Sequence, residues 1–497
     1  MLYSRMFVGL LISLYTGREV LAQLGGENYG LYMVVFSTVT LLAFVNEALG
    51  TSTSRFLNYA KGIGDLDELK KVFRTAFWGH LMAVLLIALL LETVGIWWCN
   101  HKLVVPAEQL PQIRIIYQIL LLFTISDMLS LPFRTTIFVH EKMNVFALIS
   151  IGDMCAKLAI VLLLSLFREK LVAYALMLAI EAFFVLSIYV GYCRRNFPEC
   201  RFGGQFDKKL FIRLTTFSSW NFLGSMAVSL KGNGINIVMN MFFAATLNAA
   251  FGIALHVQSS LNGFVQNFTN AAIPQLIQSY AAGETAYMEK LLLFSSKVAF
   301  FLLLLAAFPV IFDADFLLAL WLKQVPPFTS IFVRLMLIDA LINTPIYALG
   351  ALAQATGTIA LYQVVVSGII LLNVPLTYLV FKFGGLPQTA IAVAILLSLL
   401  ALLGRLLILK KLIPGFPLRD FLCSFLFRAV LAAGFAALPP LICLWFMSPG
   451  WIRFAVSSTT CVGTTVGMIL LIGFNRQERG DVCRIVREAV YKRLMWN

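Results

Sequence analysis

The chain has 497 residues, of which 60 % are hydrophobic and only 12 % are charged, against roughly 25 % charged in soluble domains. This balance excludes a water-soluble globular fold, because a soluble chain of this length would need far more polar surface. The net charge of +14 fits either a nucleic-acid-binding protein or a membrane protein, and the placement of Lys and Arg along the chain decides between them.

Apolar runs long enough to cross a bilayer recur along the whole sequence. A helix needs about 20 apolar residues to span a hydrocarbon core of roughly 30 Å. The first run has only four residues before Arg5, and no small-residue cleavage site follows it, so we expect no cleaved signal peptide and an N-terminus that extends beyond Met1. We predict an all-α, polytopic membrane protein with about fourteen spans, at 2–22, 29–50, 76–98, 115–138, 144–166, 171–193, 214–242, 247–272, 291–312, 330–354, 359–382, 388–409, 425–446 and 452–474.

The basic residues gather on one side of these predicted spans. With an even number of spans both termini lie on the same side, and most of the 38 Lys and Arg residues then fall in loops on that side or in the C-terminal tail. Basic loops face the cytoplasm, so we place both termini there. This explains the net charge and leaves no reason to expect nucleic acid as a partner.

The cysteines indicate no cofactor. The eight cysteines stand singly, without a CxxC pair or a His cluster, so the sequence predicts no zinc site and no disulfide framework. Cys193 and Cys200 flank a loop that we expect to be cytoplasmic, where thiols stay reduced.

Several short motifs recur in order at a nearly constant offset. The run Asn58–Gly62 after the second span resembles Ser279–Gly283 after the eighth, 221 residues later, and Tyr29-Gly30 resembles Phe251-Gly252 at an offset of 222. A repeat of six spans leaves both copies in the same orientation, related by an axis along the membrane normal. We therefore predict two six-helix pseudo-symmetric lobes, 1–200 and 201–412, followed by two further helices and a basic tail, 413–497. Two such lobes around a cleft are typical of an alternating-access transporter.

Polar side chains form a stripe along each of spans seven and eight, which are among the least apolar. Their spacing of three and four residues places them on one helix face. Interhelical hydrogen bonding also explains polar groups in membrane helices, but two long stripes on neighbouring spans favour the wall of a wetted cavity. The stripes consist of Asn221, Ser225, Ser229, Gly232, Asn236 and Asn240, and of His256, Ser259, Asn262, Gln266 and Asn270.

Lys231 lies within span seven but about 130° away from its stripe on a regular helix. Either Gly232 and Gly234 break the helix and re-aim the lysine into the cavity, or the lysine pairs with an acid elsewhere. Exposure of its charge to lipid is the least favourable alternative.

The first lobe carries further polar faces. Glu47, Thr51 and Arg55 share a face that runs toward the cytoplasm, and Arg5 begins a stripe of small and polar residues on span one. Asp153 and Lys157, four residues apart in span five, fit a self-neutralising ion pair or a transport role equally well.

Two spans at corresponding places of the repeat combine an aspartate with a proline. Asp127 is followed by Pro132 and Arg134, and Asp339 is followed by Pro345. Proline-interrupted spans in both halves point to a transport site, although proline kinks are also common in purely structural helices. Glu47, Asp127, Asp153 and Asp339, together with His256, are candidates for coupling to H+ or Na+; the membrane potential alone would also drive an anion outward.

Cations near span ends or within spans suggest an anionic cargo. A glycan linked to a lipid through pyrophosphate needs such cations, together with Asn, Gln and Ser for the sugar hydroxyls, and arginine suits phosphate particularly well. The cationic candidates are Arg5, Arg18, Arg55, Arg134 and Lys231.

Several motifs resemble those of Wzx-type polysaccharide flippases of the multidrug/oligosaccharidyl-lipid/polysaccharide exporter superfamily. The likeness extends over nearly the whole chain, and relatives often carry Arg where Lys231 stands. It implies two six-helix lobes plus two helices, the export of undecaprenyl-pyrophosphate-linked O-antigen or capsule repeat units, and contacts with polysaccharide polymerase machinery. The motifs are Tyr15–Gly25, Tyr29–Tyr32, Trp220-Asn221, Lys231–Asn236, Asn248–Ala250, Pro274-Gln275, Ser279–Gly283 and Ala353–Gly357.

Three other functions fit parts of the same pattern. A drug or cation antiporter of the same superfamily would centre on buried carboxylates, and a peptidoglycan-precursor (lipid II) flippase would use the same chemistry on another sugar. A membrane enzyme is disfavoured, because the predicted external loops such as 99–114 and 313–329 are short and hold no catalytic constellation.

Overall fold

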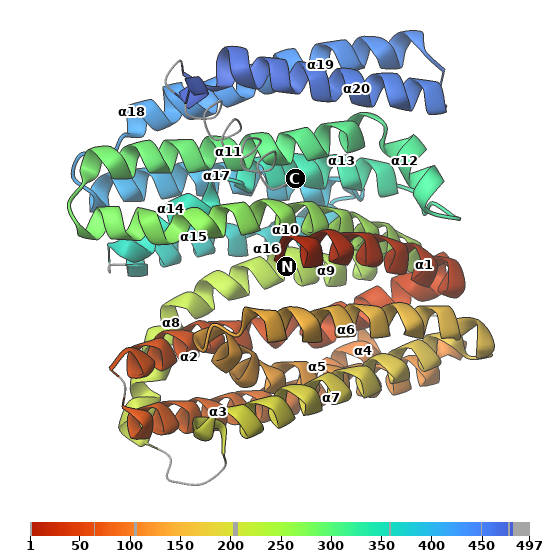
Figure 1. Cartoon of the computed structure of the whole chain (residues 1–497). Coiled ribbons are helices and arrows are strands. Elements are labelled where there is room, and N and C mark those ends of the chain that lie inside the picture. Colours follow the sequence, from red (N-terminus) through yellow and green to blue (C-terminus); the bar gives the residue numbers. More distant parts are fainter. Residues whose placement is uncertain are drawn as a thin grey trace, which may run out of the picture. The chain divides into compact units, whose positions relative to one another are not determined.

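The computed structural model describes residues 2–63, 65–103, 107–201, 207–356, 359–448, 450–475 and 478–480, and its regular elements are all helices (Figure 1). The all-α, polytopic fold is confirmed. The helices are α1 Leu2–Thr40, α2 Phe44–Ile63, α3 Leu66–Leu90, α4 Ile96–His101, α5 Leu110–Val139, α6 Met143–Leu163, α7 Lys170–Asn196, α8 Lys208–Ser229, α9 Ile235–Phe242, α10 Ala245–Ala281, α11 Thr285–Phe312, α12 Ala314–Trp321, α13 Thr329–Asn343, α14 Ile346–Ala355, α15 Ile359–Leu371, α16 Asn373–Lys382, α17 Thr389–Leu412, α18 Leu418–Asp420, α19 Arg428–Phe446 and α20 Trp451–Met468.

Eleven helical segments within the described residues are long and apolar enough to cross a membrane. The three remaining predicted spans also fall on helices. Predicted span one is continuous with the next span in α1, whereas spans seven and eight correspond to α8–α9 and to α10. Spans seven and eight carry the two polar stripes, which lower their mean hydropathy, so the prediction of about fourteen helices and the count of eleven apolar ones agree.

The first helix contains one sharp break. Gly25 has φ 80° and ψ 163°, a backbone conformation that is open to glycine but strained for other residues, and it divides α1 into two helical segments. The break lies between the first two predicted spans, 2–22 and 29–50. A glycine here therefore allows one span to end and the next to begin with almost no connecting loop.

The chain forms two compact units. Unit 1 comprises residues 1–256, 321–332 and 363–397, and unit 2 comprises 257–320, 333–362 and 398–497. The lobe boundaries predicted from the repeat, at 200 and 412, remain a prediction. Each unit is described by itself below.

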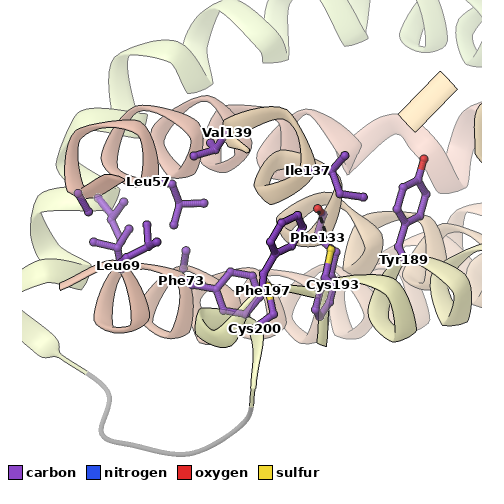
Figure 2. Close-up of a cluster of buried hydrophobic side chains, with 14 of the residues drawn as sticks. Leu57, Leu69, Phe73, Phe133, Ile137, Val139, Tyr189, Cys193, Phe197 and Cys200 are labelled. Carbon is purple, nitrogen blue, oxygen red and sulfur yellow. Dashed lines mark hydrogen bonds between the residues drawn. The ribbon is translucent and has the colours of Figure 1, made fainter. Parts of the chain in front are cut away.

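One part of the core of unit 1 lies where α2, α3, α5, α7 and α8 meet (Figure 2). Phe133 of α5 packs edge-on against Phe73 of α3, and its carbonyl accepts a hydrogen bond from the Cys193 thiol of α7. Contact with Cys193, together with burial, raises the pKa of the Cys200 thiol far above its ordinary value. Both cysteines are buried and free, so at neutral pH Cys200 stays a protonated thiol.

A close helix crossing in unit 1 involves both glycines of the repeated motif. A Cβ on Gly30 of α1 would lie 1.8 Å from the carbonyl oxygen of Ala245 in α10, whereas a Cβ on Gly252 of α10 would lie 2.6 Å from the Met33 side chain of α1. Small residues let membrane helices approach backbone to backbone. Each of the two motif glycines thus faces the helix that carries the other.

In unit 2, two buried ion pairs join α11 to α20 and to the segment that follows it. Lys297 of α11 is fully buried, and its Nζ lies 2.8 and 2.9 Å from the two carboxylate oxygens of Glu478. Asp313, directly after α11, pairs with Arg453 of α20 at 3.0 Å. The helices α19 and α20 run side by side and both contact α11 (Figure 1), so this hairpin is attached to α11 at two separated points.

Candidate functional site

A polar cavity of about 230 Å³ lies between α5, α6 and α7 in unit 1. Charged groups inside a membrane protein are costly and commonly face a water-filled path or a partner. Two aromatic rings and several apolar side chains complete the walls. The charged and hydroxyl-bearing residues that line the cavity are Asp127, Arg134, Ser150, Asp153, Lys157, Glu181 and Tyr189.

The charges of this cavity are arranged as two ion pairs. On α5, Arg134 forms a salt bridge with Asp127, seven residues earlier, and the buried Pro132 lies between them in the sequence. The Arg134 guanidinium lies 5.4 Å from the centre of the Tyr189 ring. On α6, Lys157 Nζ lies 2.7 Å from Asp153 Oδ1. All four charged side chains are partly exposed, which leaves the cavity open to ions and to a ligand.

A third carboxyl group belongs to the same cluster. Glu181 of α7 is 7 % exposed, and its carboxyl contacts that of Asp153. The oxygen Oε1 of Glu181 is buried without a hydrogen-bond partner. Among the described residues, the cavity wall therefore holds three carboxyl groups and two basic groups, so one bound proton or other monovalent cation would bring it to neutrality.

The polar face predicted for α2 is exposed, as a cavity wall requires. Glu47, Thr51, Arg55 and Asn58 are all exposed, and Glu47 lies close enough to Asp127 to interact electrostatically. The Arg55 guanidinium stacks 4.2 Å from the centre of the Phe217 ring of α8. Stacking on an aromatic ring holds a guanidinium in place without consuming its hydrogen-bond donors.

A buried network lies behind this face. His80 of α3 is 1 % exposed; its Nδ1 lies 2.5 Å from Asn46 Oδ1, and its Nε2 lies 3.2 Å from the Thr53 hydroxyl. Asn46 also donates to the carbonyl of Met128 on α5 at 3.0 Å. These residues join α2, α3 and α5, so they hold α2 against α5, one of the three helices that line the charged cavity.

The structure places Asn236 and Asn240, both predicted to bind substrate, inside the packing of unit 1. Both are fully buried, as is Asn248 of α10. Asn236 donates to Ser37 Oγ of α1 at 2.8 Å and to the Met33 carbonyl at 3.1 Å, and Asn248 bonds to both other asparagines. These contacts favour interhelical hydrogen bonding, the structural alternative that the sequence left open for this stripe.

The helix changes its register where Lys231 stands. Residues Leu230–Gly234 form a π-helical turn between α8 and α9. Such an extra residue in one turn rotates the side chains that follow relative to a regular helix. This is the break that the first alternative for Lys231 requires; Lys231 itself is half-buried, as is Asn221 on α8.

The other candidates of unit 1 lie on α1 and α10. Arg18 is half-buried, and its Nε has no hydrogen-bond partner. The imidazole of His256 lies against Gly17, because a Cβ on that glycine would be 3.4 Å from the ring. The side chain of Arg5 lies outside the described residues.

In unit 2 the predicted residues occupy different surroundings. Asp339 of α13 is 4 % exposed and accepts a hydrogen bond from Ser398 of α17 at 2.7 Å. Asn343 joins the same network through Ser398 at 3.1 Å. On α10, Asn262 is half-buried and Gln266 is exposed.

No family model and no curated protein sequence matches the chain. Solved structures do match. The lipid II flippase MurJ in an inward closed conformation has a TM-score of 0.72 at 12 % identity, over 94 % of this chain and 98 % of that one. The fold is that of membrane transporters.

Two further neighbours are MATE transporters. A multidrug resistance MATE family transporter of the MOP superfamily, in an inward-facing conformation, has a TM-score of 0.65 at 15 % identity and covers 82 % of this chain and 94 % of its own. The eukaryotic MATE transporter AtDTX14 has a TM-score of 0.58 at 14 % identity, over 81 % of this chain and 98 % of that one. At these identities the likeness concerns the fold.

Sequence reasoning missed several charged residues of the spans. Glu181, His80, Lys297 and Arg405 all lie inside predicted spans, and an ionisable residue at membrane depth is itself a signal. The sequence does not show which helix face each of them occupies or which distant residue it meets. Their position in the spans was therefore visible, whereas their partners were not.

Proposed function

We propose that the protein is a flippase that carries undecaprenyl-pyrophosphate-linked oligosaccharide units, of the O-antigen or capsule type, across a bacterial inner membrane. The lipid-linked unit enters from the cytoplasmic leaflet and leaves to the periplasmic leaflet by alternating access. The protein acts as a transporter and carries out no covalent chemistry. The exposed cationic and polar surface of α2, α5 and α6 is the observation that carries this proposal.

The chemistry of that surface suits a phosphorylated glycan. Arg55 is exposed on α2 and stacks on Phe217, and the cavity of α5–α7 adds Arg134 and Lys157. Guanidinium groups bind phosphate oxygens through paired hydrogen bonds. Thr51 and Asn58 beside Arg55 offer the neutral groups that sugar hydroxyls need. An anionic head with a glycan attached fits this combination better than a cationic drug does.

The extent of the structural likeness supports a flippase over a drug antiporter. The match to the lipid II flippase extends over 94 % of the chain, whereas the MATE match covers 82 %. The structure that is similar over more of the chain is the better template for it, and it makes lipid II flipping the second candidate function.

The charge balance of the cavity supports coupling to a cation. Asp127, Asp153 and Glu181 face only Arg134 and Lys157, so the cavity gains neutrality by taking up H+ or Na+. A cation that binds here in one conformation and leaves in another changes the relative stability of the two conformations. The electrochemical gradient would then drive the return of the empty carrier.

The test is complementation of a strain that lacks the gene. We expect the wild-type chain to restore surface polysaccharide, and Arg55→Gln combined with either Arg18→Gln or Lys231→Gln to abolish glycan export while insertion into the membrane stays normal. Normal polysaccharide in both double variants would contradict an anionic cargo.

A purified system separates the two flippase functions. In proteoliposomes, the rate of movement of a fluorescent undecaprenyl-pyrophosphate oligosaccharide is compared with that of lipid II. Faster movement of the oligosaccharide supports the proposal, faster movement of lipid II supports the second candidate, and drug efflux without either contradicts both.

A further inference from the structure

Unit 2 contains a buried arginine, Arg405, with two unsatisfied guanidinium nitrogens. Arg405 of α17 is 5 % exposed, and neither its Nε nor its Nη1 has a hydrogen-bond partner. The other buried basic residues of this unit are placed differently: Lys297 pairs with Glu478, and Arg453 pairs with Asp313. A cation removed from water without compensation is strongly unfavourable. Arg405 therefore calls for a negatively charged ligand.

A second unsatisfied polar group faces the same place. The hydroxyl of Tyr362 on α15 interacts with the Arg405 guanidinium but has no hydrogen bond of standard geometry, and Tyr362 is also 5 % exposed. Two buried donors from different helices thus meet, and Nε and Nη1 of Arg405 and the hydroxyl of Tyr362 remain unsatisfied. Buried polar groups of native proteins are nearly always satisfied, so an unfilled pair of donors points to a missing acceptor.

The packing leaves room at this point. Gly350 of α14 is half-buried, and of the described residues outside its own helix turn only the Tyr362 hydroxyl, at 3.8 Å, comes within 4 Å of a Cβ built on it. The absence of a side chain on Gly350 therefore opens an approach to the hydroxyl. The acceptor that satisfies Tyr362 and Arg405 can enter beside this glycine.

The depth of Arg405 indicates the class of ligand. It precedes Lys410 and Lys411, the basic end of α17, by five and six residues. At 1.5 Å per residue it lies about 8 Å deeper along the helix than those lysines. With the basic end at the cytoplasmic surface, as the distribution of Lys and Arg predicts, Arg405 lies about one helical turn inside the predicted span 388–409, near the interface where lipid phosphates lie. A guanidinium suits phosphate because its planar donors match the phosphate oxygens.

We propose that Arg405 and Tyr362 form a phosphate-binding site of unit 2, separate from the charged cavity of unit 1. The guanidinium donates to the phosphate oxygens, and the tyrosine hydroxyl donates to one of them. The phosphate belongs either to a membrane phospholipid or to a pyrophosphate-linked compound. The site does not depend on the proposed flippase function, because any phosphate-bearing lipid at this depth would fill it.

The experiment measures thermal unfolding of the purified full-length protein in two settings. In detergent, inorganic pyrophosphate is titrated; in nanodiscs, phosphatidylglycerol is compared with phosphatidylcholine. We expect at least one of the anionic ligands to raise Tm. A response to pyrophosphate indicates a soluble or lipid-linked diphosphate as the source, and a response to phosphatidylglycerol alone indicates a phospholipid.

Variants assign the response to this site. Arg405→Met is expected to raise the half-saturating concentration of the anionic ligand at least tenfold. It should leave Tm without ligand unchanged or higher, since it removes a buried charge that is incompletely compensated. Arg405→Lys retains the charge without the planar donors and is expected to raise the half-saturating concentration severalfold. It serves as the second variant if the Arg405→Met protein does not fold. Tyr362→Phe is expected to have a smaller effect in the same direction.

Two controls keep the site distinct from others. Arg334→Met removes an arginine of the same unit that is already paired with Asp315, and it should leave the ligand response intact. Repeating the titration with Arg55→Gln separates the response from the cavity of unit 1. The proposal is overturned if Arg405→Met responds like the wild type in both settings, if the wild type responds in neither, or if only Arg55→Gln abolishes the response. In that last case, the proposed flippase site would stand while this one fails.

Discussion

Asp127 and Asp339, which stand at corresponding places of the predicted repeat, occupy different surroundings in the two units. Asp127 in unit 1 has a side chain that is 51 % exposed and pairs with Arg134 beside a cavity, whereas Asp339 in unit 2 is 4 % exposed and accepts a hydrogen bond from Ser398. The local sequence is similar, with a proline five or six residues later. The same pattern in a membrane helix can therefore serve an open charged cavity or a sealed contact between helices.

The same difference extends to the other charges. In unit 1 the ion pairs of the cavity are partly exposed, whereas in unit 2 Lys297 and Asp313 are sealed against the segment that holds α20. Exposed ion pairs contribute little to stability, because water competes with the partner and screens the charge. Loss of one partner from a buried pair leaves an isolated charge and costs much more. The charges of unit 2 should therefore govern stability and those of unit 1 transport.

The largest effect is expected for the Lys297–Glu478 pair. Glu478→Gln leaves the Lys297 ammonium buried beside a neutral amide and should lower the free energy of unfolding by about 3 kcal/mol or more. The double variant Lys297→Met with Glu478→Met should recover most of this loss. Both are measured by reversible unfolding in mixed detergent micelles, with Lys157→Met in unit 1 as the control, expected to change stability by less than about 1 kcal/mol. Equal losses for the two lysines would remove the contrast between the units.

The next largest loss of stability is expected where α1 and α10 cross. Gly30→Ala places a methyl group against a backbone carbonyl that cannot rotate away, and we expect a loss of about 2–3 kcal/mol from overpacking. Gly252→Ala is the matched control, because its methyl group meets the flexible Met33 side chain and should cost roughly half as much. A Gly252→Ala variant that is as unstable as Gly30→Ala would show that the Met33 side chain gives way no more easily than the backbone of Ala245.

Substitutions of the two aspartates should affect different properties, stability for Asp339 and export for Asp127. Asp339→Ala leaves Ser398 without its acceptor in a buried place and should destabilise unit 2 by about 1–2 kcal/mol. Asp127→Ala should change stability by less than about 1 kcal/mol, since Arg134 is partly exposed and stacks on Tyr189. Export should nevertheless fall at least tenfold for Asp127→Ala. Unfolding and export are measured on the same variants, and full export by Asp127→Ala would exclude this acid from transport.

Much of the fold was predictable because apolar length is a local property. The helices follow the apolar runs, and Gly25 falls between the two predicted spans that have almost no loop. Polar stripes were harder to interpret. The spacing of Asn236 and Asn240 places them on one helix face, but it does not reveal that Ser37 and Asn248 fill their hydrogen bonds. Whether a polar face meets water or another helix depends on the packing.

For the charged groups too, the sequence predicts their positions in the spans but not their partners. Lys297 is visible in the sequence as a basic residue inside an apolar span, yet its partner Glu478 lies 181 residues away. Glu181 and Asp153 come together because α6 and α7 pack against each other. The sequence therefore locates candidate charges, and only tertiary contacts decide which are neutralised, which line a cavity and which, like Arg405, keep unsatisfied hydrogen-bond donors.

The smallest loss of stability is expected for an acid outside the predicted membrane spans. It serves as a reference for the charge effects within the spans. Asp207 caps the start of α8, where its carboxylate accepts a hydrogen bond from the Leu210 amide at 3.0 Å, and this bond lowers the pKa of Asp207. A lowered pKa means that the folded state binds the proton less well than the unfolded state does. The cap therefore stabilises the protein fully above the ordinary aspartate pKa of about 4 and loses its effect as the pH falls through the lowered value. We expect Asp207→Ala to show a small decrease in Tm that is constant from pH 7 to pH 5 and shrinks as the pH falls below about 4. If the decrease in Tm grew toward low pH instead, the carboxylate of Asp207 would not be the group that stabilises α8. The variant could then not serve as a reference for charge effects in the membrane-spanning helices.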